Sequence, residues 1–149
     1  PSEGAEVFVT TDAAPVVEPD DVTATITFDN TSKRTIFNTS QQVWEENDIK
    51  VINDKASSTS AVANYVKPVR FYANSKITVE APGNIVSIEF DCNSSSYATA
   101  LKNSIKTGTV SVSSDKVTVT LTDEMTSFVI EKLSAQVRMD SITVTYYLE

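Results

Sequence analysis

With 149 residues, the chain is long enough for one domain with a hydrophobic core, and its net charge is −8. Nucleic acids and anionic membranes require a basic surface, so this charge argues against both and favours a neutral or cationic partner, although solubility alone also accounts for it. The absence of histidine excludes a Ser–His–Asp triad, a Cys–His dyad and most zinc sites. The single cysteine, Cys92, excludes an internal disulfide and is expected to be a buried thiol.

The first 21 residues are predicted to be a linker or the remnant of a preceding domain, with the domain itself at 22–149. They contain three of the five prolines and an acidic cluster, a composition typical of extended linkers. Within them, Glu6–Thr11 is compatible with a strand. No signal peptide is visible and the chain begins at Pro1, so we interpret it as part of a longer protein.

Alternating apolar residues predict a series of short strands. The first is Val22–Phe28, with Val22, Ala24, Ile26 and Phe28 on its apolar face. A hairpin with its turn at Asn47-Asp48 follows, because both residue types tolerate positive φ. Strands are predicted at Gln42–Trp44, Ile49–Ile52, Val69–Ala73, Lys76–Glu80, Asn84–Cys92, Thr109–Ser113, Lys116–Leu121, Ser127–Leu133 and Ser141–Leu148, and Thr35–Phe37 is compatible with a short extended piece.

This pattern predicts an all-β fold, an antiparallel sandwich of the jelly-roll kind with one short helix. The spacing leaves no room for the crossover helices of a parallel sheet. The helix is expected at Tyr97–Ile105, with Ser95 or Ser96 as its N-cap. The predicted core consists of Ile26, Phe28, Ile77, Val79, Ile88, Phe90, Val119, Leu121, Phe128, Ile130, Ile142 and Val144.

A ligand site is predicted where the long polar loop that starts at Asn53 meets the strand Val69–Ala73. If Val69 and Phe71 point into the core, Arg70 and Tyr72 point outward together. Asn64 and Tyr65 end the loop just upstream, and Asp54 lies near its start. Aromatic rings hold the apolar faces of sugars, while Asn, Asp and Arg satisfy sugar hydroxyls. A surface ion pair at Arg70 and ordinary strand packing at Tyr72 are the alternative.

Trp44, the only tryptophan, has two interpretations: a core residue or a platform for a ligand. The carboxylates show no arrangement typical of sugar cleavage, so we expect no catalysis. No cofactor is expected, although a structural calcium is compatible with the abundant oxygen ligands, among them Asp20, Asp21, Asp29, Asp91 and Asp140.

The strings TITFDNTSKRTIFNTSQQVWEENDIKVIND, NYVKPVRFY and SYATAL carry a resemblance to a known group. From Val22 to Leu148 the chain resembles a β-sandwich accessory domain that recurs in secreted multidomain proteins of gut bacteria and is similar to jelly-roll carbohydrate-binding modules. It departs from that group by having Asn47-Asp48 in place of Asn-Gly, and Lys67-Pro68 in place of Asn-Pro. The resemblance implies a non-catalytic module.

The leading hypothesis is therefore a non-catalytic carbohydrate-binding module, secreted or at the cell surface. Its expected partners are a polysaccharide or oligosaccharide and neighbouring domains of the same chain; it is expected to be monomeric, without nucleic acid or membrane insertion. The alternative is a structural spacer or an adhesion and protein-interaction domain. Exposure of Trp44, Tyr65 and Tyr72 on one surface would favour sugar binding, whereas burial of all three would favour the spacer.

Overall fold

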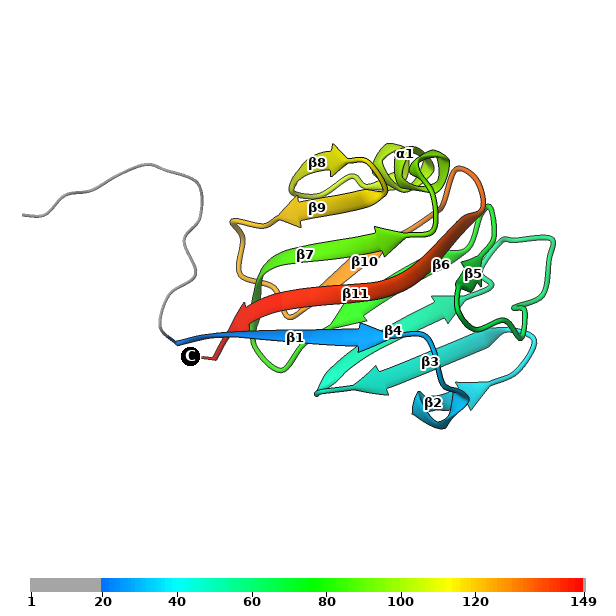
Figure 1. The fold of residues 1–149 in the computed structure, drawn as a ribbon, viewed down its shortest axis with the longest axis horizontal. Coiled ribbons are helices and arrows are strands. Elements are labelled where there is room, and N and C mark those ends of the chain that lie inside the picture. The colour runs from blue at the N-terminus through cyan, green and yellow to red at the C-terminus, as the bar shows by residue number, and fades with distance from the viewer. Residues whose placement is uncertain (1–19, 149) are drawn as a thin grey trace, which may run out of the picture.

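The computed structural model describes residues 20–148 and forms two antiparallel sheets packed face to face (Figure 1). The six-stranded sheet runs in the order β1 (Asp21–Thr27), β11 (Val137–Tyr147), β7 (Asn84–Cys92), β9 (Lys116–Thr120) and β8 (Thr109–Ser113), with β5 (Val69–Phe71) also paired to β11. The five-stranded sheet runs in the order β10 (Ser127–Ile130), β6 (Lys76–Glu80), β4 (Ile49–Asp54), β3 (Gln41–Glu46) and β2 (Arg34–Phe37).

The topology confirms the predicted fold class of an antiparallel sandwich with one short helix. The first and last strands of the described chain, β1 and β11, are neighbours, and successive segments cross between the sheets, as in jelly-roll folds. The helix α1 (Ser95–Ser104) lies beside β8 and β9 in Figure 1, and a 3₁₀ turn, η1 (Thr31–Lys33), leads into β2. Within residues 20–148, no helix has the length and apolar character that crossing a membrane requires.

Every residue of the predicted core is buried, because the strands keep the inward phase that their apolar alternation predicts. Between the sheets, the edge of Phe28 meets the ring of Trp44 at a centroid distance of 5.3 Å, and Phe28 also meets Phe71 at 6.4 Å. These T-shaped contacts fill the space between the sheets just after the end of β1. The core therefore joins residues far apart in the sequence.

Several details differ from the prediction. Val22 is exposed, at 36%, because it lies near the beginning of the edge strand β1, where the opposite sheet does not cover it. The helix begins at Ser95 and ends at Ser104, with Ser94 as the N-cap, since the Ser94 hydroxyl accepts from the Tyr97 amide. The strand predicted at Glu6–Thr11 and most of the linker lie outside the described residues.

The last strand, β11, is longer than predicted because a bulge changes its phase. Its register with β7 shifts between Met139 and Ser141, so Val137 and Met139 share one inward phase while Ile142 and Val144 share another. A strict alternation of apolar residues therefore predicts only the second half of β11, from Ser141. The bulge thus hides the first half of the strand, which carries Arg138.

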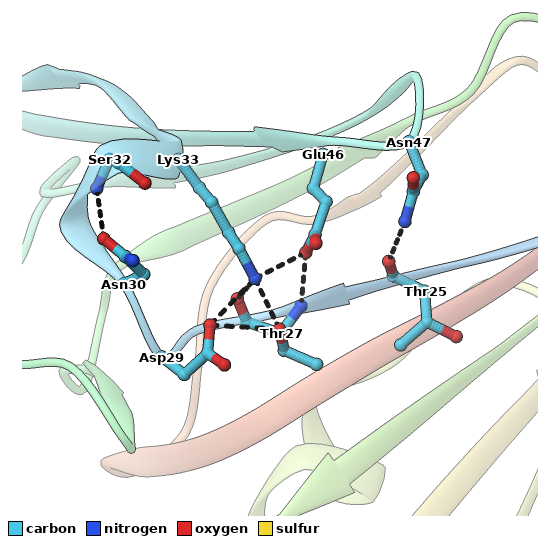
Figure 2. A network of polar contacts seen from close by, with 8 residues as sticks. All are labelled: Thr25, Thr27, Asp29, Asn30, Ser32, Lys33, Glu46 and Asn47. Atoms are coloured by element: carbon cyan, nitrogen blue, oxygen red, sulfur yellow. Dashed lines mark hydrogen bonds and ion pairs between the residues drawn. The ribbon is translucent and has the colours of Figure 1, made fainter.

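The edge of β1 is closed by polar residues from the opposite sheet (Figure 2). The Glu46 carboxylate accepts from the backbone amide of Thr27 at 2.9 Å, and the Asn47 side-chain amide donates to the carbonyl of Thr25 at 2.9 Å. Both residues lie at the β3–β4 hairpin, where Asn47 and Asp48 have the predicted positive φ. This arrangement satisfies backbone groups that an open edge strand leaves for another chain.

Lys33 joins this edge to the turn that precedes β2. Its ammonium lies 2.8 Å from an Asp29 carboxylate oxygen and 3.0 Å from a Glu46 oxygen, and it also donates to the Thr27 carbonyl at 3.2 Å (Figure 2). The hydrogen bond from Lys33 lowers the pKa of Asp29, and the bond to Asp29 raises the pKa of Lys33. The charged forms of both groups are therefore favoured by folding.

We expect Phe90→Ala and Phe128→Ala each to lower the free energy of unfolding by about 3–5 kcal/mol, because both fully buried rings leave a cavity at a tilted ring contact between the sheets. Urea denaturation measures this loss. Val112→Ala, on an exposed position of β8, is the control and is expected to change stability by less than about 0.5 kcal/mol. Losses below about 1 kcal/mol at both phenylalanines would contradict the strand phase.

We also expect Asp29→Asn to destabilise the protein at pH 6 and to have no effect in strong acid. A lowered pKa gives stability that is present above the ordinary value of 3.8 and is lost as the pH falls through the folded value. The measurement is the difference in melting temperature between parent and variant from pH 6 to pH 2. Asp123→Asn is the control, since Asp123 forms no ion pair with any residue of the described range. A difference that persists undiminished at pH 2 would contradict this linkage.

Candidate ligand-binding surface

The strand β5 presents Arg70 away from the core, as the sequence predicts. Val69 and Phe71 are fully buried on either side of it, while Arg70 is half-buried. The strand has only three residues and pairs with β11 along one edge. Its position at the side of the six-stranded sheet, next to the long loop, is visible in Figure 1. The predicted meeting of loop and strand is therefore present.

Tyr65, at the end of the long loop, stacks against Arg70. The guanidinium carbon of Arg70 lies 3.5 Å from the centroid of the Tyr65 ring, well within the range of a cation–π contact. Tyr65 remains 43% exposed, so part of its ring faces solvent. The Arg70 side chain has no hydrogen-bond partner in residues 20–148, and its Nε is buried. The contact orients a guanidinium whose N–H groups are not used by the described protein.

The backbone of β5 is held from the opposite sheet by Asn53. The Asn53 side-chain amide donates to the Arg70 carbonyl at 3.0 Å and to the Gln42 side-chain oxygen at 3.3 Å. Both amide side chains are buried between the sheets. The sequence prediction placed Asn53 at the start of the loop and missed this role. The available signal is phase: Asn53 follows Ile49 and Val51 at a spacing of two, so it lies on the inward face of β4.

Arg34 extends the surface through Asn64, the residue before Tyr65. Its guanidinium lies 4.1 Å from the Phe37 ring centroid and 5.8 Å from that of Trp44, and it donates to the Asn64 side-chain oxygen at 2.8 Å. Asn64 precedes Tyr65, so this hydrogen bond fixes the loop beside the stacked pair. Burial lowers the pKa of Arg34, because lost hydration disfavours its charged form. The sequence prediction named Asn64 but not Arg34.

Arg138 lies directly opposite Arg70 in the antiparallel register of β5 and β11. Residues directly opposite each other point to the same face, and the neighbours of Arg138, Val137 and Met139, are fully buried. Both arginines therefore point away from the core from adjacent strands. The Arg138 guanidinium lies 5.5 Å from the Tyr97 ring centroid. Arg138 was missed because it precedes the bulge in β11.

These contacts, together with the pairing of β5 and β11, link six residues from four elements and the long loop, which we call the arginine row: Arg34, Asn64, Tyr65, Arg70, Arg138 and Tyr97. The row contains every arginine of the chain. Each arginine lies over an aromatic ring. The salt bridges seen within residues 20–148 are instead made by lysines: Lys33, Lys76 and Lys116. The described residues thus offer no carboxylate partner to any arginine.

Three other predicted site residues are placed differently. Trp44 is fully buried against Phe28, so the core interpretation is confirmed and a role as a ligand platform is wrong. Its Nε1 has no hydrogen-bond partner in the described range. Asp54 accepts from the Ala56 amide at 2.8 Å and so stabilises the start of the loop. Tyr72 is half-buried beyond the end of β5 and makes no ring contact or hydrogen bond with Arg70.

The carboxylates proposed as calcium ligands are dispersed. Asp29 pairs with Lys33, and Asp91 pairs with Lys116 at 3.2 Å. No three acidic or cysteine side chains between residues 20 and 148 lie close enough together to hold a metal ion. Of the surface hollows in the described range, one is lined by Glu45, Asp48, Lys50, Glu80, Ala81 and Pro82, and another lies between the end of α1 and β10. Neither includes a residue of the arginine row.

Comparison with protein-family models, with curated proteins and with solved structures finds no match to this chain. The function is therefore inferred from the geometry and chemistry of the described residues.

Cys92 is fully buried, and burial together with Asp91, Asp115 and Asp140 raises the pKa of its thiol to about 12. The thiolate is the reactive form, so we expect negligible labelling of the folded protein by a thiol reagent such as Ellman's reagent at pH 8, and complete labelling in guanidinium chloride. The absorbance of the released product follows both reactions. Complete labelling of the folded protein within minutes would contradict the placement of Cys92.

Proposed function

We propose that the chain is a non-catalytic carbohydrate-binding module of an extracellular multidomain protein. The observation that carries the proposal is the stacked pair of Tyr65 and Arg70, which combines a partly exposed ring with an oriented guanidinium that has no hydrogen-bond or ion-pair partner among the described residues. A sugar needs both features, since its C–H face packs on an aromatic ring and its hydroxyls accept from N–H donors. The family resemblance of the sequence supports the same proposal.

The surroundings of the pair suit a binding surface on a rigid scaffold. The Tyr65 loop is held by the bond from Arg34 to Asn64, and the β5 backbone is held by Asn53. Both anchors fix the backbone on either side of the site without occupying the Arg70 guanidinium. Binding residues on loops that a sheet scaffold positions are common in proteins. We expect micromolar to millimolar affinity, because released water offsets most of the hydrogen-bond energy.

The alternative of a spacer or adhesion domain is not favoured by a specific contact. Of the three aromatic residues whose exposure discriminates the two functions, Trp44 is buried, Tyr72 is half-buried and Tyr65 is exposed. The exposed ring, that of Tyr65, lies 3.5 Å from the Arg70 guanidinium, whereas the buried ring of Trp44 lies 5.8 Å from that of Arg34. Sugar binding is thus supported at one aromatic position rather than at three.

We expect Tyr65→Ala to weaken glycan binding at least tenfold, because it removes the ring and the stacking partner of Arg70. An affinity-gel screen with soluble neutral and acidic polysaccharides identifies a ligand, and isothermal titration calorimetry measures its affinity for parent and variant. The melting temperature should stay within a few degrees, since Tyr65 is partly exposed and its cation–π contact is worth about 0.5–1 kcal/mol.

The control is Tyr147→Ala, a tyrosine at the other end of β11, about 30 Å along the strand from Arg138. This variant is expected to bind like the parent. Equal binding by parent and Tyr65→Ala would place the site elsewhere on the sandwich. No binding to any polysaccharide of the screen would contradict the proposed function and leave the spacer or adhesion domain.

A further inference from the structure

Two arginines that face each other across β5 and β11 are an unusual arrangement for a chain of net charge −8. Arg70 and Arg138 are directly paired in the register, so their Cβ atoms are about 4.5–5.5 Å apart, and like charges in such positions destabilise a sheet. The chain has 20 acidic residues, yet neither arginine forms an ion pair with one in the described range. Even Asp140, two residues beyond Arg138, forms no ion pair with either arginine.

The Nη donors of the two guanidiniums have no hydrogen-bond partner in residues 20–148, whereas the Nε of Arg70 is buried. Arg138 uses its Nε in a bond of 3.2 Å to the Gln136 side-chain oxygen, and Arg70 makes no side-chain hydrogen bond within residues 20–148. A guanidinium carries five N–H donors in a planar fork. Tyr65 and Tyr97 flank the pair by stacking, which restrains the plane of each guanidinium without occupying the N–H groups at its edge.

We propose that Arg70 and Arg138 together bind the oxyanion of an acidic sugar, the carboxylate of a uronic acid or a sulfate ester. An oxyanion between the two guanidiniums compensates both charges, and fork geometry favours paired N–H to oxygen bonds. Tyr65 packs against the ring of the same sugar. This inference rests on the proposed function and specifies its class of ligand.

Arg34 adds a third guanidinium to the proposed site, beyond the Arg70–Arg138 pair. Arg34 reaches Tyr65 through Asn64, so a third guanidinium lies along the arginine row from the Arg70–Arg138 pair. A polymer with repeated oxyanions therefore fits the row better than an isolated acidic monosaccharide. The acidic residues elsewhere on the chain do not prevent this, because charges separated by more than about 8 Å are largely screened at physiological ionic strength.

The test compares acidic oligosaccharides with neutral counterparts of the same sugars. Oligogalacturonate is paired with its methyl ester, oligoalginate and hyaluronan fragments with their carboxyl-reduced forms, and dextran sulfate with dextran. Calorimetry at 50 and 200 mM salt measures each affinity for the full chain. We expect at least one acidic member to bind tenfold or more tightly than its neutral counterpart, with affinity falling as salt increases. Whether the carboxylate or the sulfate members bind distinguishes the two oxyanions.

Variants connect the preference to the arginine pair. Arg70→Gln and Arg138→Gln should each reduce the affinity for the acidic ligand at least tenfold, and Arg138→Lys should reduce it less, because it keeps the charge but loses the fork. Lys50→Gln is the control: it removes one positive charge from the outer face of the five-stranded sheet and should change affinity less than twofold. Melting temperatures confirm that each variant is folded.

The outcomes separate this inference from the proposed function. Binding of neutral and acidic forms with equal affinity, lost in Tyr65→Ala, would overturn the oxyanion site and retain the carbohydrate-binding module. An acidic preference that Lys50→Gln removes as effectively as Arg138→Gln would also overturn the site, since overall charge would then explain it. Failure of every neutral and acidic glycan to bind would overturn both proposals.

Discussion

The hydrogen bond from the Asn53 side chain to the Arg70 carbonyl is the constraint on which the candidate ligand-binding surface depends. The strand β5 has three residues and one neighbour in its sheet, so its pairing with β11 alone gives it few ladder bonds. Asn53 adds an attachment from the opposite sheet and shares its amide with Gln42. The Asn53 residue is buried, and the loss of one partner there leaves a polar group unsatisfied at a cost of about 1–3 kcal/mol. The register that brings Arg70 opposite Arg138 therefore has support from both sheets.

The side of the sandwich next to β1 is closed by a related device. Here the β3–β4 hairpin of the five-stranded sheet supplies Glu46 and Asn47 to backbone groups of β1, and Lys33 forms an ion pair with the Glu46 carboxylate (Figure 2). In both places a side chain of one sheet satisfies the backbone of a strand in the other. The two sheets are thus joined by directional bonds at their margins as well as by apolar contacts between them. Such bonds specify how the sheets are placed, which apolar packing alone specifies weakly.

The sequence predicts the fold well where the apolar alternation is unbroken. The bounds of β6, β7 and β8 agree with those expected, and the predicted inward phase is correct throughout the core. The prediction fails where another effect overrides alternation: the bulge in β11 conceals its first half, and the edge position of β1 exposes Val22. These features depend on which strands become neighbours, and that information is not local in the sequence.

The candidate site could be predicted from the sequence only for residues that are close together in the chain. Tyr65, Arg70 and Asn64 lie close together in the sequence, so strand phase and loop position identify them. Arg34 and Arg138 come from strands far away in the chain and join the site only through sheet topology. Trp44, in contrast, was named as a candidate but does not belong to the site. Its residue type suggests a ligand platform, whereas its inward position on β3 buries it.

The way the arginines are held is itself informative about what they do. A carboxylate partner would stabilise each guanidinium but would occupy the N–H edge that a ligand needs. An aromatic partner contacts the flat face instead and leaves that edge available. In a chain with 20 acidic residues, carboxylates are the commoner candidates for partners, yet each arginine has a ring. Stacking thus fixes the orientation of the charge while preserving its capacity to donate, which is the combination that a binding residue requires and a purely structural ion pair does not.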